Sequence, residues 1–134
     1  MRDPEGKAPQ WLREYYEDVD NMRMDAFLSH HTDDVVVQFG NNPQAHGKDQ
    51  VGGAIGHFWE MIGGLDHEFL NVYQDGDTTA LEALIHYKRL DDVTVPVPCT
   101  TLIHRTGDLA DFVRIYIDVA PVFAEAAVEG ASTS

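Results

Sequence analysis

The main change in the spacing of the apolar residues along this chain of 134 residues comes at Gly63-Gly64. Before that point, outside the β-branched run Val35–Val37, the apolar residues recur every three or four positions, as Leu12, Tyr16 and Val19 do, which is the spacing of one helix face. After it, apolar and polar residues alternate, as they do in strands with one buried face. Helices followed by a run of strands predict an α+β fold, in which the helices cover one face of a curved sheet and enclose a cavity.

Three helices and five strands are predicted along the chain. The helices are expected from Gln10, around Met24–Leu28 and over Lys48–Ile62, and the strands over Asp33–Phe39, Asp66–Tyr73, Thr78–Leu90, Val93–Arg105 and Ala110–Val119. Short turns rich in Asp and Gly separate the last four strands, which is typical of an antiparallel meander.

The length fits one domain, which we expect at residues 10–124, with a flexible lead-in at 1–9 and a disordered tail at 125–134. Nine lysines and arginines stand against 23 aspartates and glutamates, so the formal net charge is −14. Phosphate backbones and anionic membrane surfaces both bind basic patches. The charge therefore argues against nucleic acid and against a membrane as partners.

Cysteine and histidine usage narrows the chemistry further. Cys99 is the only cysteine, so the chain has no internal disulfide, and its first residues have no apolar stretch of the kind that directs secretion. We therefore expect a reducing, cytoplasmic location. The seven histidines lack the spacing of zinc sites and the glycines lack that of phosphate-binding loops, so no metal and no cofactor are expected.

The strand register decides which side chains face the expected cavity. Two-residue turns at Gly107-Asp108 and Asp91-Asp92 align Thr100 with Ile115 on one side and with Ala83 on the other. This register gives an apolar inner face, which is favoured because burying an unpaired charge costs more than exposing an aromatic edge. The residues on this inner face are Leu81, Ala83, Ile85, Tyr87, Pro98, Thr100, Leu102, His104, Val113, Ile115 and Ile117.

A loop of three residues at 106–108 gives a second register, because a slip of one residue turns every side chain of a strand to the other face. Cys99 then lies beside Ile115, and Glu82 and His86 point into the cavity. The sequence leaves both registers open, and each predicts a different catalytic base.

Three segments of the chain resemble segments of the nuclear-transport-factor-2-like superfamily. Asp33–Phe39 looks like its first strand, His46–Val51 like the start of its third helix, and Arg114–Asp118 like the Arg-x-Tyr-x-Asp of its last strand. Their order over residues 10–124 is similar to that of SnoaL-like polyketide cyclases, limonene-epoxide hydrolase and ketosteroid isomerase. The resemblance implies a cone-shaped barrel, with three N-terminal helices on a strongly curved antiparallel or mixed sheet, one deep apolar pocket and a homodimer.

The resemblance also indicates where such relatives carry catalytic carboxylates. Ile115 takes the position of an aspartate of the epoxide hydrolases, and Phe39 and Thr100 take the positions of two acids of the isomerases. None of these three side chains has a carboxyl group. Acid–base chemistry in this chain therefore needs other residues.

Four residues are candidates for catalysis. His104 is the candidate base in the first register, and His86 paired with Glu82 is the candidate in the second. Tyr16 is the candidate hydrogen-bond donor to a substrate carbonyl, because ketosteroid isomerases carry an oxyanion-donating tyrosine near this part of the first helix. The alternatives are a surface position for His104 and a packing role for Tyr16. The expected pocket walls are Tyr15, Val37, Phe39, Phe58, Trp59, Ile62, Tyr87, Thr100, Leu102, Ile115 and Ile117.

These features predict a cofactor-independent isomerase or cyclase that transfers a proton on a hydrophobic, polyketide- or steroid-like substrate. The alternative is a non-catalytic module that binds a hydrophobic ligand or dimerises, because the pocket carboxylates of related hydrolases and isomerases are missing. A hydrophobic small molecule is the expected ligand, and a homodimer is the expected assembly.

Overall fold

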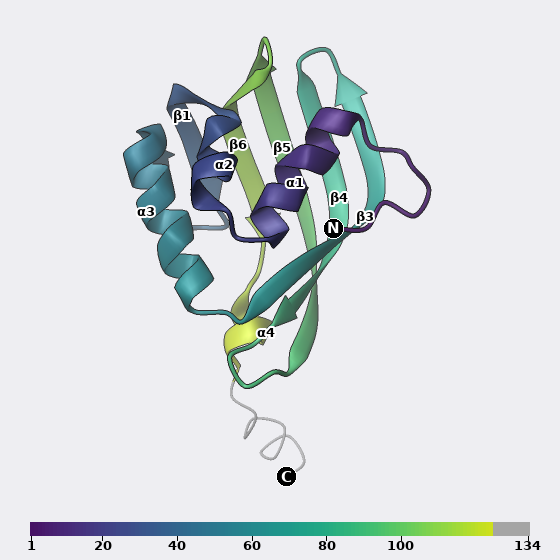
Figure 1. Ribbon diagram of the computed structural model, residues 1–134, viewed down its shortest axis with the longest axis vertical. Helices are drawn as coiled ribbons and strands as arrows, with labels where there is room; N and C mark the ends of the chain where they lie inside the picture. Colours follow the sequence, from purple (N-terminus) through teal and green to yellow (C-terminus); the bar gives the residue numbers. More distant parts are fainter. Residues whose placement is uncertain (125–134) are drawn as a thin grey trace.

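The computed structural model describes residues 1–124, which form four helices and one six-stranded sheet (Figure 1). The elements in chain order are α1 (Gln10–Asp20), α2 (Met24–Ser29), β1 (His31–Phe39), β2 (Ala45–His46), α3 (Gly47–Glu60), β3 (Gly64–Asp75), β4 (Thr78–Lys88), β5 (Thr94–Thr106), β6 (Leu109–Ile117) and α4 (Ala120–Phe123). The strands lie in the order β2-β1-β6-β5-β4-β3, with β1 parallel to β6 and the other neighbours antiparallel. The tail expected at 125–134 lies outside the described residues.

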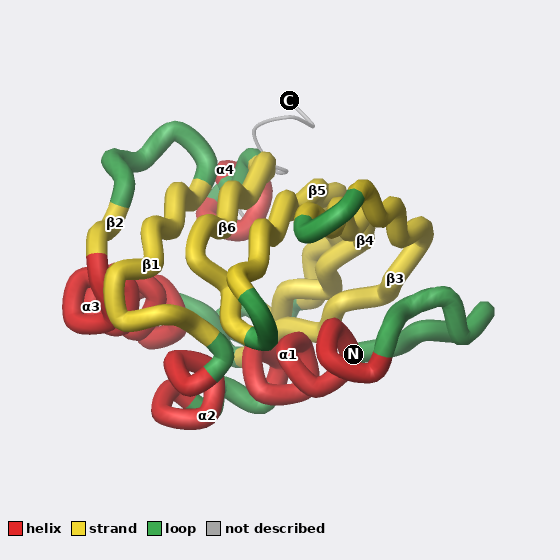
Figure 2. The backbone as a smooth tube through the Cα atoms, turned by 90° about the horizontal axis from the view of Figure 1, so that it is seen from above, coloured by secondary structure: helices red, strands yellow, loops and turns green. Residues whose placement is uncertain are grey.

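The sheet is strongly curved, and α1, α2 and α3 lie on its concave side (Figure 2). The predicted α+β class is therefore confirmed, and Gly63-Gly64 separates the last of the three covering helices from the meander of strands. The sequence did not predict β2 or α4, which have only two and four residues. No helix within residues 1–124 is both long enough and apolar enough to cross a membrane.

Helix α1 buries the stripe that its sequence predicts. Leu12, Tyr15, Tyr16 and Val19 are each 9% exposed or less, and the helix packs on β3. Complete burial of a leucine side chain such as Leu12 contributes about 2 kcal/mol to folding. This packing brings the last turn of α1 against the first half of β3.

Residues 1–9, which we expected to form a loose lead-in, run beside β3. The N–H of Arg2 donates to the carbonyl of His67 at 2.7 Å, and the N–H of Phe69 donates to the carbonyl of Arg2 at 2.8 Å. The carboxylate of Asp3 accepts a hydrogen bond from the N–H of Ala8 at 3.1 Å. This short parallel bridge fixes the backbone at and after His67.

The hairpin between β4 and β5 has a three-residue loop, Leu90–Asp92, instead of the expected two-residue turn. Asp92 has a left-handed backbone, with φ of 69°. A type I turn followed by one left-handed residue is a common form of three-residue hairpin loop. Because of the extra loop residue, Ala83 pairs with Cys99 and not with Thr100.

The hairpin between β5 and β6 has the predicted two-residue turn at Gly107-Asp108, but a β-bulge follows at once. Asp111 is the extra residue of the bulge, and its carboxylate accepts a hydrogen bond from Nδ1 of His104 at 2.6 Å. Beyond the bulge Thr101 pairs with Ile115. Neither of the two registers predicted from the sequence is therefore correct.

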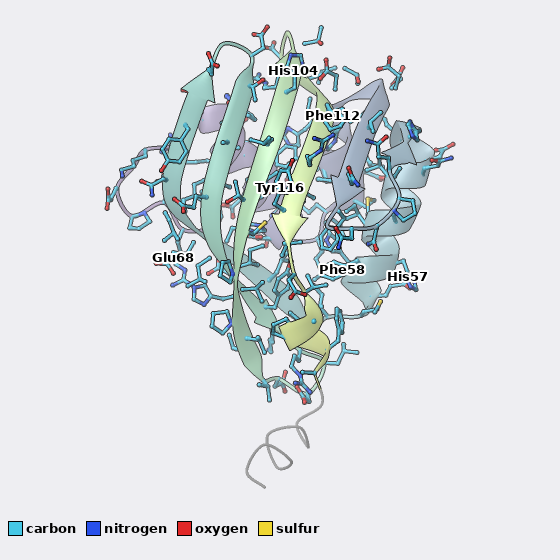
Figure 3. All side chains as sticks on the ribbon, turned by 180° about the vertical axis from the view of Figure 1, so that it is seen from behind. His57, Phe58, Glu68, His104, Phe112 and Tyr116 are labelled. Carbon is cyan, nitrogen blue, oxygen red and sulfur yellow. The ribbon has the colours of Figure 1, made fainter. Side chains whose placement is uncertain are left out.

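The bulge and the longer loop decide which residues of β5 face the helices. On β4 the predicted inner residues are correct: Leu81, Ala83, Ile85 and Tyr87 are 2% exposed or less. On β5 the inner residues are Val97, Cys99, Thr101 and Ile103, each 5% exposed or less. The predicted inner positions Pro98, Thr100, Leu102 and His104 are wrong, because they lie on the outer face, as Glu82 and His86 do. Figure 3 shows His104 on this face.

Candidate active site

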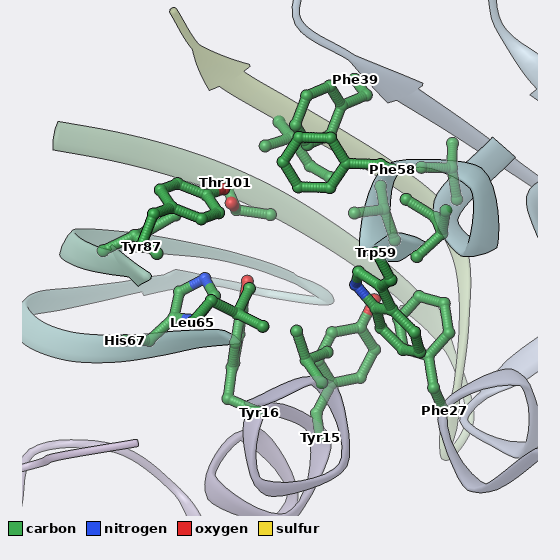
Figure 4. A pocket seen from close by; sticks show the side chains of 16 residues that line it. Tyr15, Tyr16, Phe27, Phe39, Phe58, Trp59, Leu65, His67, Tyr87 and Thr101 are labelled. Atoms are coloured by element: carbon green, nitrogen blue, oxygen red, sulfur yellow. The ribbon is translucent and has the colours of Figure 1, made fainter. Parts of the chain in front are cut away.

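A small cavity lies between the helices and the concave face of the sheet (Figure 4). Its volume is about 50 Å³, and most of its wall is aromatic or aliphatic. The residues that line it are Tyr15, Tyr16, Val19, Phe27, Val37, Phe39, Ile55, Phe58, Trp59, Leu65, His67, Ile85, Tyr87, Thr101, Val113 and Ile115. Helices α1, α2 and α3 and five strands thus contribute to one apolar wall with few polar groups.

His67 is the one histidine among the described residues that line this cavity. It comes from β3, it is 5% exposed, and it shares the inner face of that strand with Phe69. Asp20, the last residue of α1, follows Tyr16 by one helical turn and reaches the same place. Within residues 1–124, no three His, Cys, Asp or Glu side chains converge in the manner of a metal site.

Asp20 holds His67 with both carboxylate oxygens. Oδ1 of Asp20 lies 2.7 Å from Nδ1 of His67, and Oδ2 accepts the backbone N–H of His67 at 2.8 Å. The amino group of Met1 lies 3.1 Å from the same Oδ2. The side chains of His67 and Asp20 are only 6% and 5% exposed. Two buried polar groups are thereby partnered, which is the condition for keeping them away from water.

This hydrogen bonding assigns the proton of the neutral imidazole to Nδ1, because an ionised carboxylate only accepts. The second ring nitrogen, Nε2, then carries the lone pair. Figure 4 shows the His67 ring directed into the space bordered by Tyr16, Tyr87 and Thr101. An imidazole that a carboxylate orients, with its free nitrogen facing a cavity, has the arrangement of a general base.

Hydroxyl groups are the other polar components of the wall around His67. The ring centroid of Tyr16 lies 4.5 Å from that of His67. Burial raises the pKa of Tyr16 well above its ordinary value, and the pKa of Tyr87 is raised for the same reason. The nearby hydroxyl of Thr101 opposes the shift at Tyr16. Both phenols therefore stay protonated at neutral pH and can donate a hydrogen bond to a ligand oxygen.

Tyr15 also lines the cavity, but its hydroxyl group has a partner inside the protein. The hydroxyl lies 2.8 Å from Nε2 of His31, a residue with no exposed surface. Burial lowers the pKa of His31 to about 4, although the carbonyls of Leu28 and Phe27 oppose the shift. Nδ1 of His31 makes no hydrogen bond of ordinary geometry with the described residues. Nε2 of a neutral His31 accepts a hydrogen bond from the Tyr15 hydroxyl, so Tyr15 serves the cavity as a wall residue.

Most of the wall predicted from the sequence lies where expected. The predicted residues that line the cavity are Tyr15, Tyr16, Val37, Phe39, Phe58, Trp59, Tyr87 and Ile115. Ile62 is buried in the core but does not border the cavity, and Ile117 lies outside it at the end of β6. Thr100 and Leu102 lie on the outer face because of the register described above.

Three of the predicted catalytic residues lie outside the cavity: His104 has the surface position given above as its alternative, and the second register, which placed Glu82 and His86 inside, is wrong. His104 is bound to Asp111 at 2.6 Å on the outer face of the sheet. Nε2 of His86 lies 2.8 Å from Oε1 of Glu68, and Glu82 points to the same outer face. Tyr16 is the predicted catalytic candidate that borders the cavity.

Sequence reasoning missed His67, Asp20 and Thr101. Two of them carry a signal in the sequence: His67 alternates in phase with the apolar Phe69, and Asp20 stands four positions after the inward-facing Tyr16. Thr101 carries no such signal, because its direction depends on the bulge and on the loop length.

An open, strongly curved sheet that helices cover on its concave face, with one apolar cavity between them, defines the nuclear-transport-factor-2-like class of folds. The model of the SnoaL-like domain family matches residues 12–117, and the chain therefore belongs to this family. No curated protein sequence matches the chain.

Solved structures share the fold over nearly their full length. A protein of Catenulispora acidiphila DSM 44928 with a ketosteroid-isomerase-like fold, in complex with trimethylamine, has a TM-score of 0.79 and 17% identity, over 90% of this chain and 95% of that chain. A protein of Jannaschia sp. CCS1, provisionally named a SnoaL-like polyketide cyclase, has a TM-score of 0.71 and 18% identity, over 92% and 95%. An LEH-like epoxide hydrolase of M. tuberculosis has a TM-score of 0.70 and 14% identity, over 85% and 84%. At these identities the likeness concerns the fold.

Proposed function

We propose that the protein is a cofactor-independent isomerase or cyclase that transfers a proton on a hydrophobic small molecule, and that His67 is its base. The observation that carries this proposal is the buried Asp20–His67 pair, which presents a ring nitrogen to an apolar cavity. In such a dry cavity, each hydrogen bond to a developing charge is worth more than it is in water.

The reaction that suits these groups begins with enolisation. Nε2 of His67 takes a proton from a carbon next to a carbonyl, the C–H electron pair becomes a C=C bond, and the carbonyl oxygen gains the negative charge. Tyr16 donates a hydrogen bond to that oxygen. Asp20 stabilises the imidazolium that His67 becomes, and it keeps the ring in position.

Two outcomes complete the reaction without an oxidant, a reductant or a second substrate. In an isomerisation, the imidazolium of His67 returns the proton to a different carbon of the conjugated system. In a cyclisation, the enolate carbon attacks a second carbonyl of the same molecule, and the imidazolium protonates the alkoxide that forms. Both outcomes regenerate neutral His67.

The wall of the cavity favours a neutral, apolar substrate. No lysine or arginine of the described chain lines it, and Phe27, Phe39, Phe58 and Trp59 supply much of its surface. A polyketide- or steroid-like molecule has this chemistry. Membership of the SnoaL-like family and the likeness to a provisionally named polyketide cyclase support the same substrate class.

A second candidate function is the binding of a hydrophobic ligand without turnover. Phe39 and Ile115 favour it, because they line the cavity at positions where related isomerases and hydrolases carry catalytic carboxylates, and neither has a carboxyl group. The homodimer that the family resemblance implies stays a prediction, which light scattering on the purified protein tests.

The exchange of α-protons in β-tetralone, a neutral bicyclic ketone, separates the two candidates. In deuterated buffer, NMR follows the loss of the α-proton signal with and without protein. We expect the wild type to accelerate exchange, and His67→Gln to reduce the acceleration by about 10²-fold or more. His104→Gln, an outer-face histidine, is the matched control and leaves exchange unchanged.

Two results contradict parts of the proposed function. Equal exchange with wild type and H67Q excludes His67 as the base. Exchange at the rate of buffer alone, together with quenching of tryptophan fluorescence by β-tetralone, supports the non-catalytic candidate, because Trp59 forms part of the wall.

A further inference from the structure

A second and larger cavity lies directly behind the wall of the first. Its volume is about 310 Å³, and it lies between α3, β1, β2 and the chain around α4. Its lining residues are Val37, Phe39, Asn42, Pro43, Ala45, Val51, Ala54, Ile55, His57, Phe58, Met61, Val119 and Phe123. Four residues, Val37, Phe39, Ile55 and Phe58, line both cavities, so the two spaces share a wall. We call the space beside His67 the inner cavity and this larger space the outer cavity.

Phe39 and Phe58 form the aromatic part of the shared wall. Their ring centroids lie 4.9 Å apart, and both side chains are only partly buried. Phe58 also contacts Tyr87 and Phe123, at centroid distances of 5.8 Å and 6.1 Å. These rings are held by van der Waals contacts and no hydrogen bond, so a change of the Phe58 rotamer is among the least costly ways to join the two cavities.

The two cavities differ in volume and in chemistry. The inner cavity contains His67, Tyr16 and Thr101, but its volume of about 50 Å³ accommodates only a few non-hydrogen atoms. The outer cavity lies within the usual range of ligand sites, about 300–1,000 Å³, and its wall is apolar apart from Asn42 and His57. The reactive groups and the space for a ligand are therefore on opposite sides of Phe39 and Phe58.

We infer that the outer cavity is the subsite for the unreactive, apolar part of the substrate, which reaches His67 past a displaced Phe58 ring. This inference rests on the proposed function of the inner cavity. It defines the substrate class as an elongated neutral molecule that has a carbonyl or enol at one end and an apolar body several carbons long at the other. The polar end occupies the inner cavity and the apolar body occupies the outer cavity.

A series of para-alkylphenols tests this inference, because a phenol imitates an enol and the alkyl chain imitates the apolar body. Phenol, para-propylphenol and para-hexylphenol are titrated against the wild-type protein, and Trp59 fluorescence reports binding. We expect Kd to fall with every added methylene, by up to about fourfold each. The same Kd for all three phenols, or no binding by any of them, overturns the inference.

Ala54→Phe fills the outer cavity from α3, at an exposed position that does not border the inner cavity. This variant is expected to bind phenol as the wild type does but to lose the dependence on chain length. Gly53→Phe is the matched control, because an added side chain at this neighbouring helical position meets open space. This variant is expected to keep the dependence of Kd on chain length. A chain-length dependence that survives in A54F contradicts the inference.

His67→Gln distinguishes this inference from the proposed function. If His67 accepts the phenol hydroxyl, H67Q raises Kd for all three phenols by the same factor and leaves the chain-length dependence unchanged. If H67Q changes nothing while A54F still removes the dependence, the proposed role of His67 fails and the outer subsite stands. Phe58→Ala is expected to speed the association of para-hexylphenol severalfold in stopped-flow experiments, and an unchanged rate excludes Phe58 as the barrier.

Discussion

Three of the four histidine–carboxylate pairs within residues 1–124 lie on the sheet, and they have nearly the same N···O distance in very different surroundings. The His67–Asp20 pair has a distance of 2.7 Å, and the outer-face pairs His104–Asp111 and His86–Glu68 have distances of 2.6 Å and 2.8 Å. The side chain of His67 is 6% exposed, whereas those of His104 and His86 are 47% and 25% exposed. A histidine–carboxylate pair alone is therefore not enough to make a catalytic base. What distinguishes His67 is the apolar cavity at its second nitrogen.

The sheet produces this contrast. Its concave face is covered by the helices, which exclude water, and its convex face carries the more exposed Glu68 and His104 (Figure 3). On the convex face water and salt weaken each ion pair. On the concave face His67 has one partner, and its other nitrogen is left for a ligand.

The largest effect is expected from removing each histidine in turn. His67→Gln reduces the acceleration of β-tetralone exchange by about 10²–10⁴-fold, the usual contribution of a general base. His86→Gln, like the H104Q control above, changes exchange less than twofold, because its ring lies on the other side of the sheet. If H86Q reduces the exchange rate as much as H67Q does, the cavity-facing position of His67 is not what makes it the base.

His31 differs from all of these histidines, because it is buried and has no carboxylate partner among the described residues. Its folded-state pKa of about 4 lies below the unfolded value, so the unfolded chain binds more protons between those two values. The free energy of unfolding therefore falls as pH drops from about 6.5, by about 3 kcal/mol once pH is below about 4.

Urea denaturation at pH values between about 7 and 4 measures this loss. A His31→Gln variant, which cannot titrate at that position, is expected to show a correspondingly shallower dependence on pH. The same slope in the variant and the wild type contradicts the assignment to His31.

Asp20→Asn tests whether the carboxylate orients His67. An amide can donate to Nδ1 and so favours the tautomer with its proton on Nε2, which cannot act as a base. We expect kcat for exchange to fall by about tenfold or more, with little change in KM. Asp111→Asn makes the same change in the outer-face pair of His104 and leaves kcat unchanged, while an equal fall in both variants points to a general loss of structure.

The smallest effect is expected at the surface. Glu68→Gln removes the charge from the His86 pair, and a partly exposed pair of this kind contributes at most about 1 kcal/mol. Urea denaturation at neutral pH measures the change in the free energy of unfolding. A loss of several kcal/mol shows that this outer pair is as important to folding as a buried one.

The fold could be predicted from the sequence because each of its layers has a distinct period. The stripe of Leu12, Tyr16 and Val19 and the alternation along β4 both depend on neighbours close in sequence. The aromatic wall residues follow from the same patterns, so Phe58 and Trp59 were predicted correctly.

The sequence placed His104 in the cavity wrongly, because the facing of β5 depends on features that the sequence shows only weakly. The left-handed Asp92 lengthens one loop by a residue, and the bulge at Asp111 shifts the next strand by another. The longer loop changes the facing of β5 relative to β4, and the bulge changes it by the same step relative to β6. Together they move His104 out of the cavity and Thr101 into it. The partnership of His67 with Asp20 joins residues 47 positions apart, so no local pattern indicates it.

The protonation of the His67 ring tests the central claim most directly. A long-range proton–nitrogen NMR spectrum of nitrogen-labelled protein separates the two ring nitrogens of each histidine. We predict that the neutral form of His67 carries its proton on Nδ1 and leaves Nε2 bare, and that the Nε2 resonance shifts when phenol binds while those of His104 and His86 do not. A proton on Nε2 of neutral His67, or an Nε2 resonance that phenol leaves unchanged, contradicts the account.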